Sequence, residues 1–361
     1  MITHMPSHNH PTSAESPLGG VNEDPPRALI TGGTGFIGGH LSTELLRRGY
    51  DVTVIDNLVT GPLDNVGALI GHPNFHVVVD DICDSEALDS LVSQADVVFH
   101  LAAVVGVQLV VEDALTTIQT NVLGTEAVLR AAQRHSVKVL VASTSEVYGK
   151  CVKLPASEDD DVLLGASRNS RWSYAASKLV DEFLALAYHR QHGLPVVIFR
   201  LFNTVGPRQT GRYGMVIPRF VAAALNGEPI PVYGDGLQSR SFLHVHDAVD
   251  GILGLADNPS AVGQVFNIGG SEEITIVDLA EKVLDEIRPL ATESAGISFI
   301  PYGEAYAVGY EDVRRRFADT TKIRELIGWQ PRRSLDDVIN DVAMEMTSGL
   351  GQDVHEGALS R

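Results

Sequence analysis

Residues 27–39 read RALITGGTGFIGG, a short apolar run followed by a turn in which glycine recurs. We expect a strand over Arg27–Thr31, a turn over Gly32–Gly39 and a helix over His40–Arg48. In this order the glycines let the backbone approach a pyrophosphate, and the N-terminus of the helix offers it unpaired N–H groups. The alternative is a purely structural turn, which the strand–turn–helix order disfavours.

Strands and helices continue to alternate from this motif to about residue 203. Apolar, strand-like runs lie at 51–55, 75–79, 97–101, 137–143 and 195–201, and helical stretches lie at 85–93, 114–135 and 174–191. Such alternation is typical of a doubly wound α/β fold, in which a parallel sheet has helices on both faces.

Beyond Asn203 the pattern changes, because proline and glycine divide the chain into short elements. We therefore predict a dinucleotide-binding domain over 27–203, with 241–258 returning to it, and a smaller substrate-binding lobe over 204–345. Residues 1–26, rich in proline, serine, histidine and asparagine, are predicted to be a disordered leader, and 346–361 a tail.

Composition and charge limit the partners. The 27 Lys and Arg against 46 Asp and Glu give a formal net charge of −19, which disfavours nucleic acid and anionic membranes. The two cysteines, Cys83 and Cys151, are too few for a disulfide framework or a cysteine zinc site, and we predict no metal. No apolar run reaches the ~18 residues of a membrane span, and no signal-peptide pattern is found. We expect a cytoplasmic protein.

The second predicted strand ends at Asp56. A carboxylate at this place accepts hydrogen bonds from a ribose hydroxyl and repels a 2′-phosphate. No arginine follows in Asn57-Leu58-Val59, so the sequence favours NAD over NADP. The alternative is an aspartate that only caps the next turn.

Tyr174 and Lys178 are four residues apart on a predicted helix and therefore share one face. An ammonium beside a phenol stabilises the phenolate and lowers a pKa that starts near ~10. Tyr174 is thus the candidate base, with Lys178 as its electrostatic partner. The strand over 137–143 ends where ligands bind in parallel sheets, followed by Thr144 and Glu146. Thr144 is a candidate to bond the reacting hydroxyl, whereas Glu146 either acts on the substrate or caps the turn.

The strings TGGTGFIGGH, VIDNL, FHLAA, TNVLGT, STSEVYG, SYAASK, RLFNTVGPR, VYGDG, QSRSF and FNIGG occur in this order. Together they make the chain similar to the extended short-chain dehydrogenase/reductase superfamily, in its sugar-nucleotide epimerase and decarboxylase branch, over about residues 27–340. The resemblance implies a Rossmann domain that binds NAD and a C-terminal lobe that holds a nucleoside diphosphate sugar. It also implies a homodimer and oxidation of the sugar at C4.

The resemblance further assigns roles to residues. It implies that Tyr174 takes the proton of the C4 hydroxyl, that Lys178 supports Tyr174, and that Thr144 steadies the oxygen. The residues implied to bind NAD are Gly32, Gly35, Phe36, Ile37, Gly38, Asp56, Asn57, Asp81, Ile82, Leu101, Ala102, Ala103, Asn121, Ser143, Tyr174 and Lys178. The residues implied to bind the UDP-sugar are Ser145, Asn203, Arg212, Arg219, Tyr233, Arg240 and Tyr310.

Two departures from plain 4-epimerases make the chain resemble UDP-glucuronate decarboxylases. Glu146 follows Ser145 where epimerases usually have Ser or Thr, and Arg316 falls on the catalytic arginine of the decarboxylases. Such an enzyme oxidises UDP-glucuronate at C4. The oxidised sugar then loses its carboxylate as CO2, and the product is UDP-xylose or UDP-4-keto-xylose. Glu146 and Arg316 are therefore predicted to be catalytic.

Two alternatives stay open. Residues 104–110 read VVGVQLV and are closer to the corresponding loop of some uronate epimerases, which favours epimerisation of UDP-glucuronate to UDP-galacturonate. The other alternative is a non-catalytic, NAD-sensing scaffold on the same fold. The intact set of Tyr174, Lys178 and Thr144 disfavours this scaffold.

Overall fold

The structure is a computed structural model that describes residues 24–106, 110, 113–151, 153–211, 215–290, 296–305 and 313–356, the side chains of 305 and 349–356 excepted. Residues 1–23 of the predicted leader, and Arg212 and Tyr310 of the predicted site, lie outside the described residues. Among the described residues, no helix combines the length and the apolar character needed to span a bilayer.

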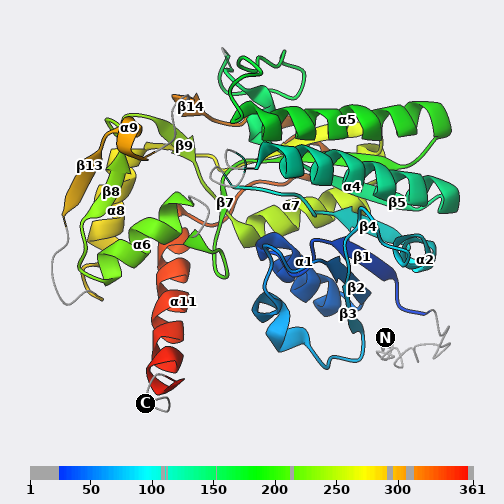
Figure 1. Cartoon of the computed structure of the whole chain (residues 1–361), viewed down its shortest axis with the longest axis horizontal. Helices are drawn as coiled ribbons and strands as arrows, with labels where there is room; N and C mark the ends of the chain where they lie inside the picture. The colour runs from blue at the N-terminus through cyan, green and yellow to red at the C-terminus, as the bar shows by residue number, and fades with distance from the viewer. Residues whose placement is uncertain are drawn as a thin grey trace, which may run out of the picture.

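A seven-stranded sheet forms the centre of the larger of the two halves of the molecule, the sheet domain (Figure 1). Its strand order is β11-β6-β5-β4-β1-β2-β3, and all neighbouring strands are parallel. The strands are β1 (Arg27–Thr31), β2 (Asp51–Asp56), β3 (Phe75–Val79), β4 (Val97–His100), β5 (Lys138–Thr144), β6 (Val196–Leu201) and β11 (Gln264–Ile268). The predicted doubly wound α/β fold is confirmed. The strand order reverses between β1 and β4, where the carboxyl ends of such sheets bind ligands.

Helices cover both faces of this sheet. The elements α1 (Phe36–Arg47) and α7 (Val245–Asp257) pack on one face, and α2 (Leu88–Gln94), α4 (Ala114–His135) and α5 (Trp172–His192) pack on the other. Figure 1 shows α4 and α5 side by side along the outer edge of this half. Leu29 and Ile30 are neighbours in β1 and both are buried, but they belong to opposite cores, as strands covered on both faces require.

The first helix begins earlier than the glycine pattern predicts. We expected a turn through Gly39, but α1 begins at Phe36 and Gly38 lies in its first turn. A Cβ atom on Gly38 would lie 2.4 Å from the carbonyl oxygen of Gly32. The last glycines of the pattern therefore allow the helix to pack closely on the turn, instead of forming the turn themselves.

The second half is a smaller lobe with its own apolar core between α6, α8, α11 and β8. It contains α6 (Val216–Leu225), β8 (Ile230–Tyr233), β9 (Ser239–Ser241), β12 (Glu273–Thr275), α8 (Ile276–Ile287), β13 (Ile297–Ile300), β14 (Arg315–Arg316) and α11 (Leu335–Glu356). The remaining short elements of the whole molecule, in chain order, are η1 (Leu63–Leu69), η2 (Ser145–Tyr148), β7 (Thr204–Val205), β10 (Leu243–His244), η4 (Pro259–Ala261), α9 (Tyr302–Ala305) and α10 (Thr321–Ile327).

Two predicted boundaries need correction. The prediction assigns residues 264–268 to the lobe over 204–345, but they form β11, which pairs with β6 and extends the central sheet. The predicted tail over 346–361 begins inside a helix, because α11 continues to Glu356. Neither feature is visible in local sequence, since strand pairing and the docking of a terminal helix depend on distant residues.

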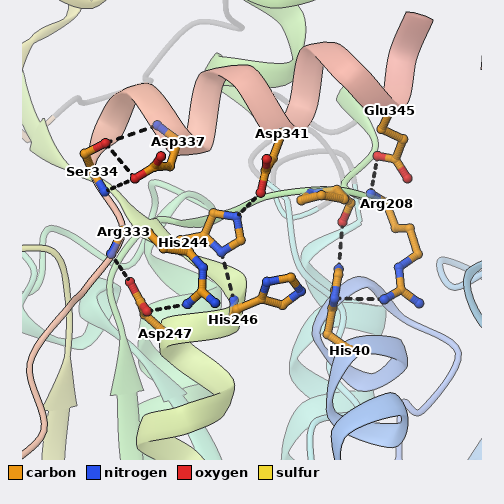
Figure 2. Close-up of polar contacts among 11 residues, drawn as sticks. His40, Arg208, His244, His246, Asp247, Arg333, Ser334, Asp337, Asp341 and Glu345 are labelled. Carbon is orange, nitrogen blue, oxygen red and sulfur yellow. Dashed lines mark hydrogen bonds and ion pairs between the residues drawn. The ribbon is translucent and has the colours of Figure 1, made fainter. Parts of the chain in front are cut away.

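The two halves meet where α11 passes α1 and α7, around three histidines (Figure 2). Arg208 Nη2 lies 2.8 Å from His40 Nδ1, so this nitrogen accepts and Nε2–H donates to the carbonyl oxygen of Pro207 at 2.9 Å. Burial lowers the pKa of His40 to about 3, and Arg208 adds to the effect. His244 Nε2 lies 3.1 Å from Asp341 Oδ2 on α11. Burial lowers the pKa of His244 as well, and the two imidazoles connect the sheet domain to the lobe.

Candidate active site

The dinucleotide end of the site is formed by the glycine turn and the start of α1. Gly35 is the N-cap of α1 and provides no side-chain hydrogen bond to the first N–H groups of the helix. Gly32 has φ +71, and a Cβ atom there would lie 2.7 Å from the backbone nitrogen of Ala102. An uncapped helix N-terminus behind a turn without side chains fits a pyrophosphate.

Asp56 braces this turn from the end of β2. Its Oδ2 accepts from the backbone N–H of Thr34 at 3.1 Å, and its Oδ1 accepts from that of Leu58 at 2.9 Å. Asp56 therefore caps the next turn and also faces the glycine loop, where the ribose interpretation requires it. Each carboxylate oxygen keeps a second lone pair that a ribose hydroxyl can use.

Other predicted dinucleotide residues gather beside it. Asn57 Nδ2 donates to Asp81 Oδ2 at 2.9 Å, and a hydrogen bond from the backbone of Cys83, together with Asn57, lowers the pKa of Asp81. Ile82 is buried next to them, and Leu101–Ala103 follows β4 directly against the glycine turn. The residues therefore fit NAD, with the turn for its pyrophosphate and Asp56 for its ribose.

A cavity of about 300 Å³ lies between the ends of β5 and β6 and the lobe. It brings together nine of the residues predicted for catalysis or substrate binding, which are Thr144, Ser145, Glu146, Tyr174, Asn203, Arg219, Tyr233, Arg240 and Arg316. It also contains residues that were given no role from sequence, namely Arg171, Thr204, Gln209, Gln238 and Tyr302. Residues separated by more than 170 positions thus share one wall.

Tyr174 stands at this wall with Thr144 and Glu146. The Thr144 hydroxyl oxygen accepts from the backbone N–H of Glu146 at 3.2 Å, which leaves its proton for the phenol oxygen of Tyr174. Burial raises the pKa of Tyr174 above its usual range and the charge of Glu146 raises it further, while the Thr144 hydrogen bond acts to lower it. Tyr174 is therefore a neutral phenol in the protein alone.

The predicted effect of Lys178 on Tyr174 is opposed by an ion pair. The lysine Nζ lies 2.7 Å from Asp181 Oδ2, and both side chains are almost fully buried. Because a carboxylate offsets the ammonium, the field at the phenol is weaker than the Tyr-x-x-x-Lys spacing suggests. Asp181 itself acts to raise the pKa of Tyr174.

Glu146 is held between two guanidinium groups. Its Oε1 lies 2.6 Å from Arg316 Nη1 and its Oε2 lies 3.1 Å from Arg171 Nη1. Burial acts to raise the pKa of Glu146, but Arg316, Arg171 and Arg240 outweigh it and lower the pKa to about 2. Glu146 is thus ionised at neutral pH and orients both arginines at the cavity.

The far end of the cavity carries polar atoms suited to a nucleotide. The guanidinium of Arg219 lies 4.2 Å from the ring centroid of Tyr233. Arg219 Nε and Gln238 Oε1 are buried and have no hydrogen-bond partner within the described part of the chain, and Thr204 Oγ1 and Gln209 Oε1 share this property. Buried polar atoms without partners are costly, so a ligand with donors and acceptors fits this end.

Three predicted residues are committed to other contacts. The Ser143 hydroxyl donates to Glu182 Oε1 at 2.5 Å, inside a cluster with Arg200 and away from the cavity. Asn121 donates to Ser177 Oγ at 3.0 Å and accepts from the backbone N–H of Val104 at 2.8 Å, so it joins α4, α5 and the loop after β4. Asn203 lines the cavity, but its amide donates to the carbonyl oxygen of Ser241 at 2.8 Å.

The amino-acid sequence is similar to a known family and to two named decarboxylases. Residues 29–342 match the family described as GDP-mannose 4,6 dehydratase. The chain is 43% identical to UDP-N-acetyl-alpha-D-glucosaminuronate decarboxylase of Bacillus cytotoxicus over 87% of this chain and 96% of that protein. It is 36% identical to UDP-glucuronic acid decarboxylase 1 of Danio rerio, over 88% of this chain and 72% of that protein.

A solved structure is similar as well. The UDP-glucuronic acid 4-epimerase of Bacillus cereus, in complex with UDP-glucuronic acid and NAD, superposes with a TM-score of 0.79 at 28% identity. The match covers 89% of this chain and 99% of that one. Decarboxylases and an epimerase thus share one architecture with this protein.

Proposed function

Because the chain belongs to the GDP-mannose 4,6-dehydratase family, we propose that it is an NAD-dependent decarboxylase of a UDP-linked uronic acid. In this proposal UDP-glucuronate is converted, through a C4-keto sugar, to UDP-xylose or UDP-4-keto-xylose. The single observation that supports it most is the cluster of Arg171, Glu146 and Arg316 beside Tyr174. The resemblance to named decarboxylases at 36–43% identity supports the same activity.

The chemistry follows from the arrangement of this chain's residues. Bound NAD supplies the acceptor for the C4 hydride. Tyr174, which is hydrogen-bonded to Thr144, must first lose its own proton, and as the phenolate it is placed to accept the proton of the C4 hydroxyl. The resulting ketone is β to the carboxylate, so the C5–CO2 bond can break and leave its electron pair in an enolate. Arg316 and Arg171 provide positive charge near that enolate. Protonation of the enolate at C5 gives UDP-4-keto-xylose, and return of the hydride to C4 and of a proton to its oxygen gives UDP-xylose.

The charge of the cluster favours a carboxylate-bearing sugar. Two guanidinium groups share the one carboxylate of Glu146, so these three groups together carry a net positive charge. The side chains of Arg171 and Arg316 are only 6% and 10% exposed, which strengthens a charge-assisted contact with an anion. A neutral hexose would offer no anionic group to this net positive charge.

The sugar's C2 substituent is the finer question within the proposal. The relative from Bacillus cytotoxicus is named for a substrate with an N-acetyl group, whereas the relative from Danio rerio is named for UDP-glucuronic acid. Both substrates have the uronate carboxylate and the C4 hydroxyl that the proposed steps need. The chemistry shared by both is a UDP-uronate, and the test compares the two.

A direct test incubates the purified protein with UDP-glucuronate and, in parallel, with UDP-N-acetylglucosaminuronate, and analyses the products by mass spectrometry. The proposal predicts loss of the mass of CO2 from at least one substrate. An unchanged mass with a new sugar stereoisomer would replace the proposal by 4-epimerisation, for which the similarity to the Bacillus cereus enzyme is the supporting observation. No conversion of either substrate would leave the scaffold alternative.

We propose a homodimer through α4 and α5. Exposed apolar side chains lie on both helices, with Leu115, Ile118 and Leu123 on α4 and Val180 and Phe183 on α5. Apolar residues that recur on two adjacent helices fit a second copy of the same face. Phe183→Glu should give a monomer by light scattering, whereas Ile70→Glu, at an exposed apolar residue outside these helices, should leave the mass unchanged. A Phe183→Glu variant that keeps the parent's mass would contradict this interface.

A cytoplasmic location is also part of the proposal. Both cysteines, Cys83 and Cys151, are unpaired, which supports a reducing compartment. Cell fractionation with an antibody to the protein would test it, and recovery in the membrane or secreted fraction would contradict it.

A further inference from the structure

Lys178 is held by a carboxylate that the proposed steps do not use. Asp181 follows it by one turn of α5, and the Nζ–Oδ2 distance is 2.7 Å. The lysine side chain is 3% exposed and the aspartate side chain is fully buried. A lysine and an aspartate three residues apart are common on helix surfaces, but a sealed pair costs desolvation of both charges.

Asp181 depends on this lysine. Within the described residues, neither of its carboxylate oxygens accepts a hydrogen bond of ideal geometry, and the donors that approach it are the Lys178 ammonium and the Thr125 hydroxyl. Burial raises the pKa of Asp181, while Lys178 and the Thr125 hydroxyl on α4 act to lower it. A purely structural aspartate usually satisfies its oxygens with backbone N–H groups, as Asp247 does with those of Arg332 and Arg333.

A row of hydrogen bonds connects the dinucleotide turn to Thr125. The backbone N–H of Ala102 donates to Thr31 Oγ1 at 3.3 Å, and that hydroxyl lies 2.7 Å from His100 Nδ1. His100 Nε2 lies 2.9 Å from Thr125 Oγ1. Burial lowers the pKa of His100 to about 3, with Lys178 adding to the effect, so its ring is neutral.

One assignment of protons satisfies the whole row. Thr31 donates to His100 Nδ1, the Nε2–H of His100 donates to Thr125, and the Thr125 proton then points to Asp181. Each bond dipole is then directed toward the buried carboxylate, which favours its charged form. The segment that lies against the glycine turn is thereby linked to the pair on α5.

We propose that Asp181 is a positioning residue for the proposed reaction, which holds the ammonium of Lys178 and its own carboxylate on the Tyr174 face of α5. The inference rests on the proposed function, in which Tyr174 is the base. The charged groups that act most on Tyr174 are Glu146, Asp181 and Arg316, and Lys178 shares its face of α5. Those that face the pair itself are Glu182 on α5 and His100 on β4.

The sign of the effect follows from these charges. The negative charge of Asp181 acts to raise the pKa of Tyr174, so replacing it with a neutral amide lowers that pKa. The acid limb of the pH–rate profile should therefore move to lower pH, by roughly 1 unit. The same change leaves a buried ammonium without its carboxylate, and the displaced lysine should slow the step about 10- to 100-fold.

The experiment compares Asp181→Asn with the parent by two readouts. The first is the rate of reduced-nicotinamide formation on mixing with UDP-uronate across pH. The second needs no substrate: the ultraviolet titration of tyrosinate, in which Tyr174 is isolated by subtracting the matching Tyr174→Phe protein. Asp181→Glu should restore the parent's profile in part. Thr125→Val, a milder change that keeps the ion pair, should shift both readouts the same way by less.

A matched control is Asp247→Asn. Asp247 on α7 is also buried and paired, with Arg333 at 2.6 Å, but it lies at the junction of the two halves (Figure 2). It should lower stability without moving either pH readout. Unshifted titration of Tyr174 in Asp181→Asn and in Thr125→Val would overturn the inference. A parent that never reduces its nicotinamide would instead contradict the proposed function, and the substrate-free titration would still decide the role of Asp181.

Discussion

Two buried clusters flank Tyr174, and they differ in their balance of charge. Lys178 and Asp181 form a pair of one cation and one anion, sealed between α4 and α5. Arg171, Glu146 and Arg316 form a group of two cations and one anion at the cavity wall. A balanced and sealed pair is suited to hold a group in place. A group with excess positive charge, facing a cavity, is suited to receive an anion.

Charges from both clusters affect the pKa of Tyr174. The charges of Glu146 and Asp181 act to raise its pKa, and Arg316 acts to lower it. A substrate carboxylate would compete with Glu146 for the arginines, whereas Lys178 and Asp181 do not line the cavity and stay out of its reach. The comparison therefore assigns anion recognition to one side of the base and positioning to the other.

The largest effect is expected when the group between the clusters is removed. Tyr174→Phe keeps the ring but loses the phenol oxygen, so hydride transfer should slow by about 10²–10⁴-fold. NAD retention should not change, because the glycine turn and Asp56 are untouched. Rapid-mixing absorbance of reduced nicotinamide measures the step, and a rate near that of the parent would exclude Tyr174 as the base.

The second-largest effect concerns the cluster of Arg171, Glu146 and Arg316 and tests whether it binds the sugar carboxylate. Arg316→Ala should weaken binding of UDP-glucuronate about 10- to 100-fold, since a charge-assisted contact is worth ~1.5–3 kcal/mol. Binding of UDP-glucose, which has no carboxylate, should fall much less. Arg315→Ala is the matched control, because Arg315 precedes Arg316 in β14 but pairs with Glu273 at the exposed surface. Calorimetric titration would contradict the assignment if both sugars lost affinity equally.

A smaller effect concerns stability and pH. The folded protein lowers the pKa of Glu146 from 4.5 to about 2, so its charged form stabilises the fold fully above pH 4.5, and this contribution disappears as pH falls toward 2. Glu146→Gln should therefore reduce the free energy of unfolding at pH 7 by on the order of 3 kcal/mol, with a gap that narrows below pH 4.5. Urea unfolding across pH measures it. A gap independent of pH would show that packing, and not charge, explains the loss.

The local part of this molecule could be predicted from sequence. The strand at 27–31 and the helix at 114–135 have the predicted bounds, because a short apolar run and a capped periodic segment are determined by neighbouring residues. The membership of β11 in the central sheet and the extent of α11 could not be predicted in this way. Both depend on pairing or packing with residues far along the chain.

The candidate site also has a part that the sequence predicts and a part that depends on distant contacts. Tyr174, Glu146 and Arg316 were found by spacing and by resemblance, and the cavity brings them together. The partnership of Lys178 with Asp181 was missed, because an i, i+3 pair gains significance only when α4 buries it. Arg171 had a signal in the resemblance of residues 170–174 to the decarboxylases, but its contact with Glu146 needs the fold.

The central claim is that the cavity removes a carboxylate after oxidation at C4. The most direct measurement mixes the protein rapidly with UDP-glucuronate or its 2-acetamido counterpart and follows reduced nicotinamide together with trapped CO2. The account predicts that reduced nicotinamide forms first and that CO2 follows it, in stoichiometric amount, from at least one of the two. Accumulation of a 4-epimer without any CO2, or no reduced nicotinamide with either substrate, would contradict the account.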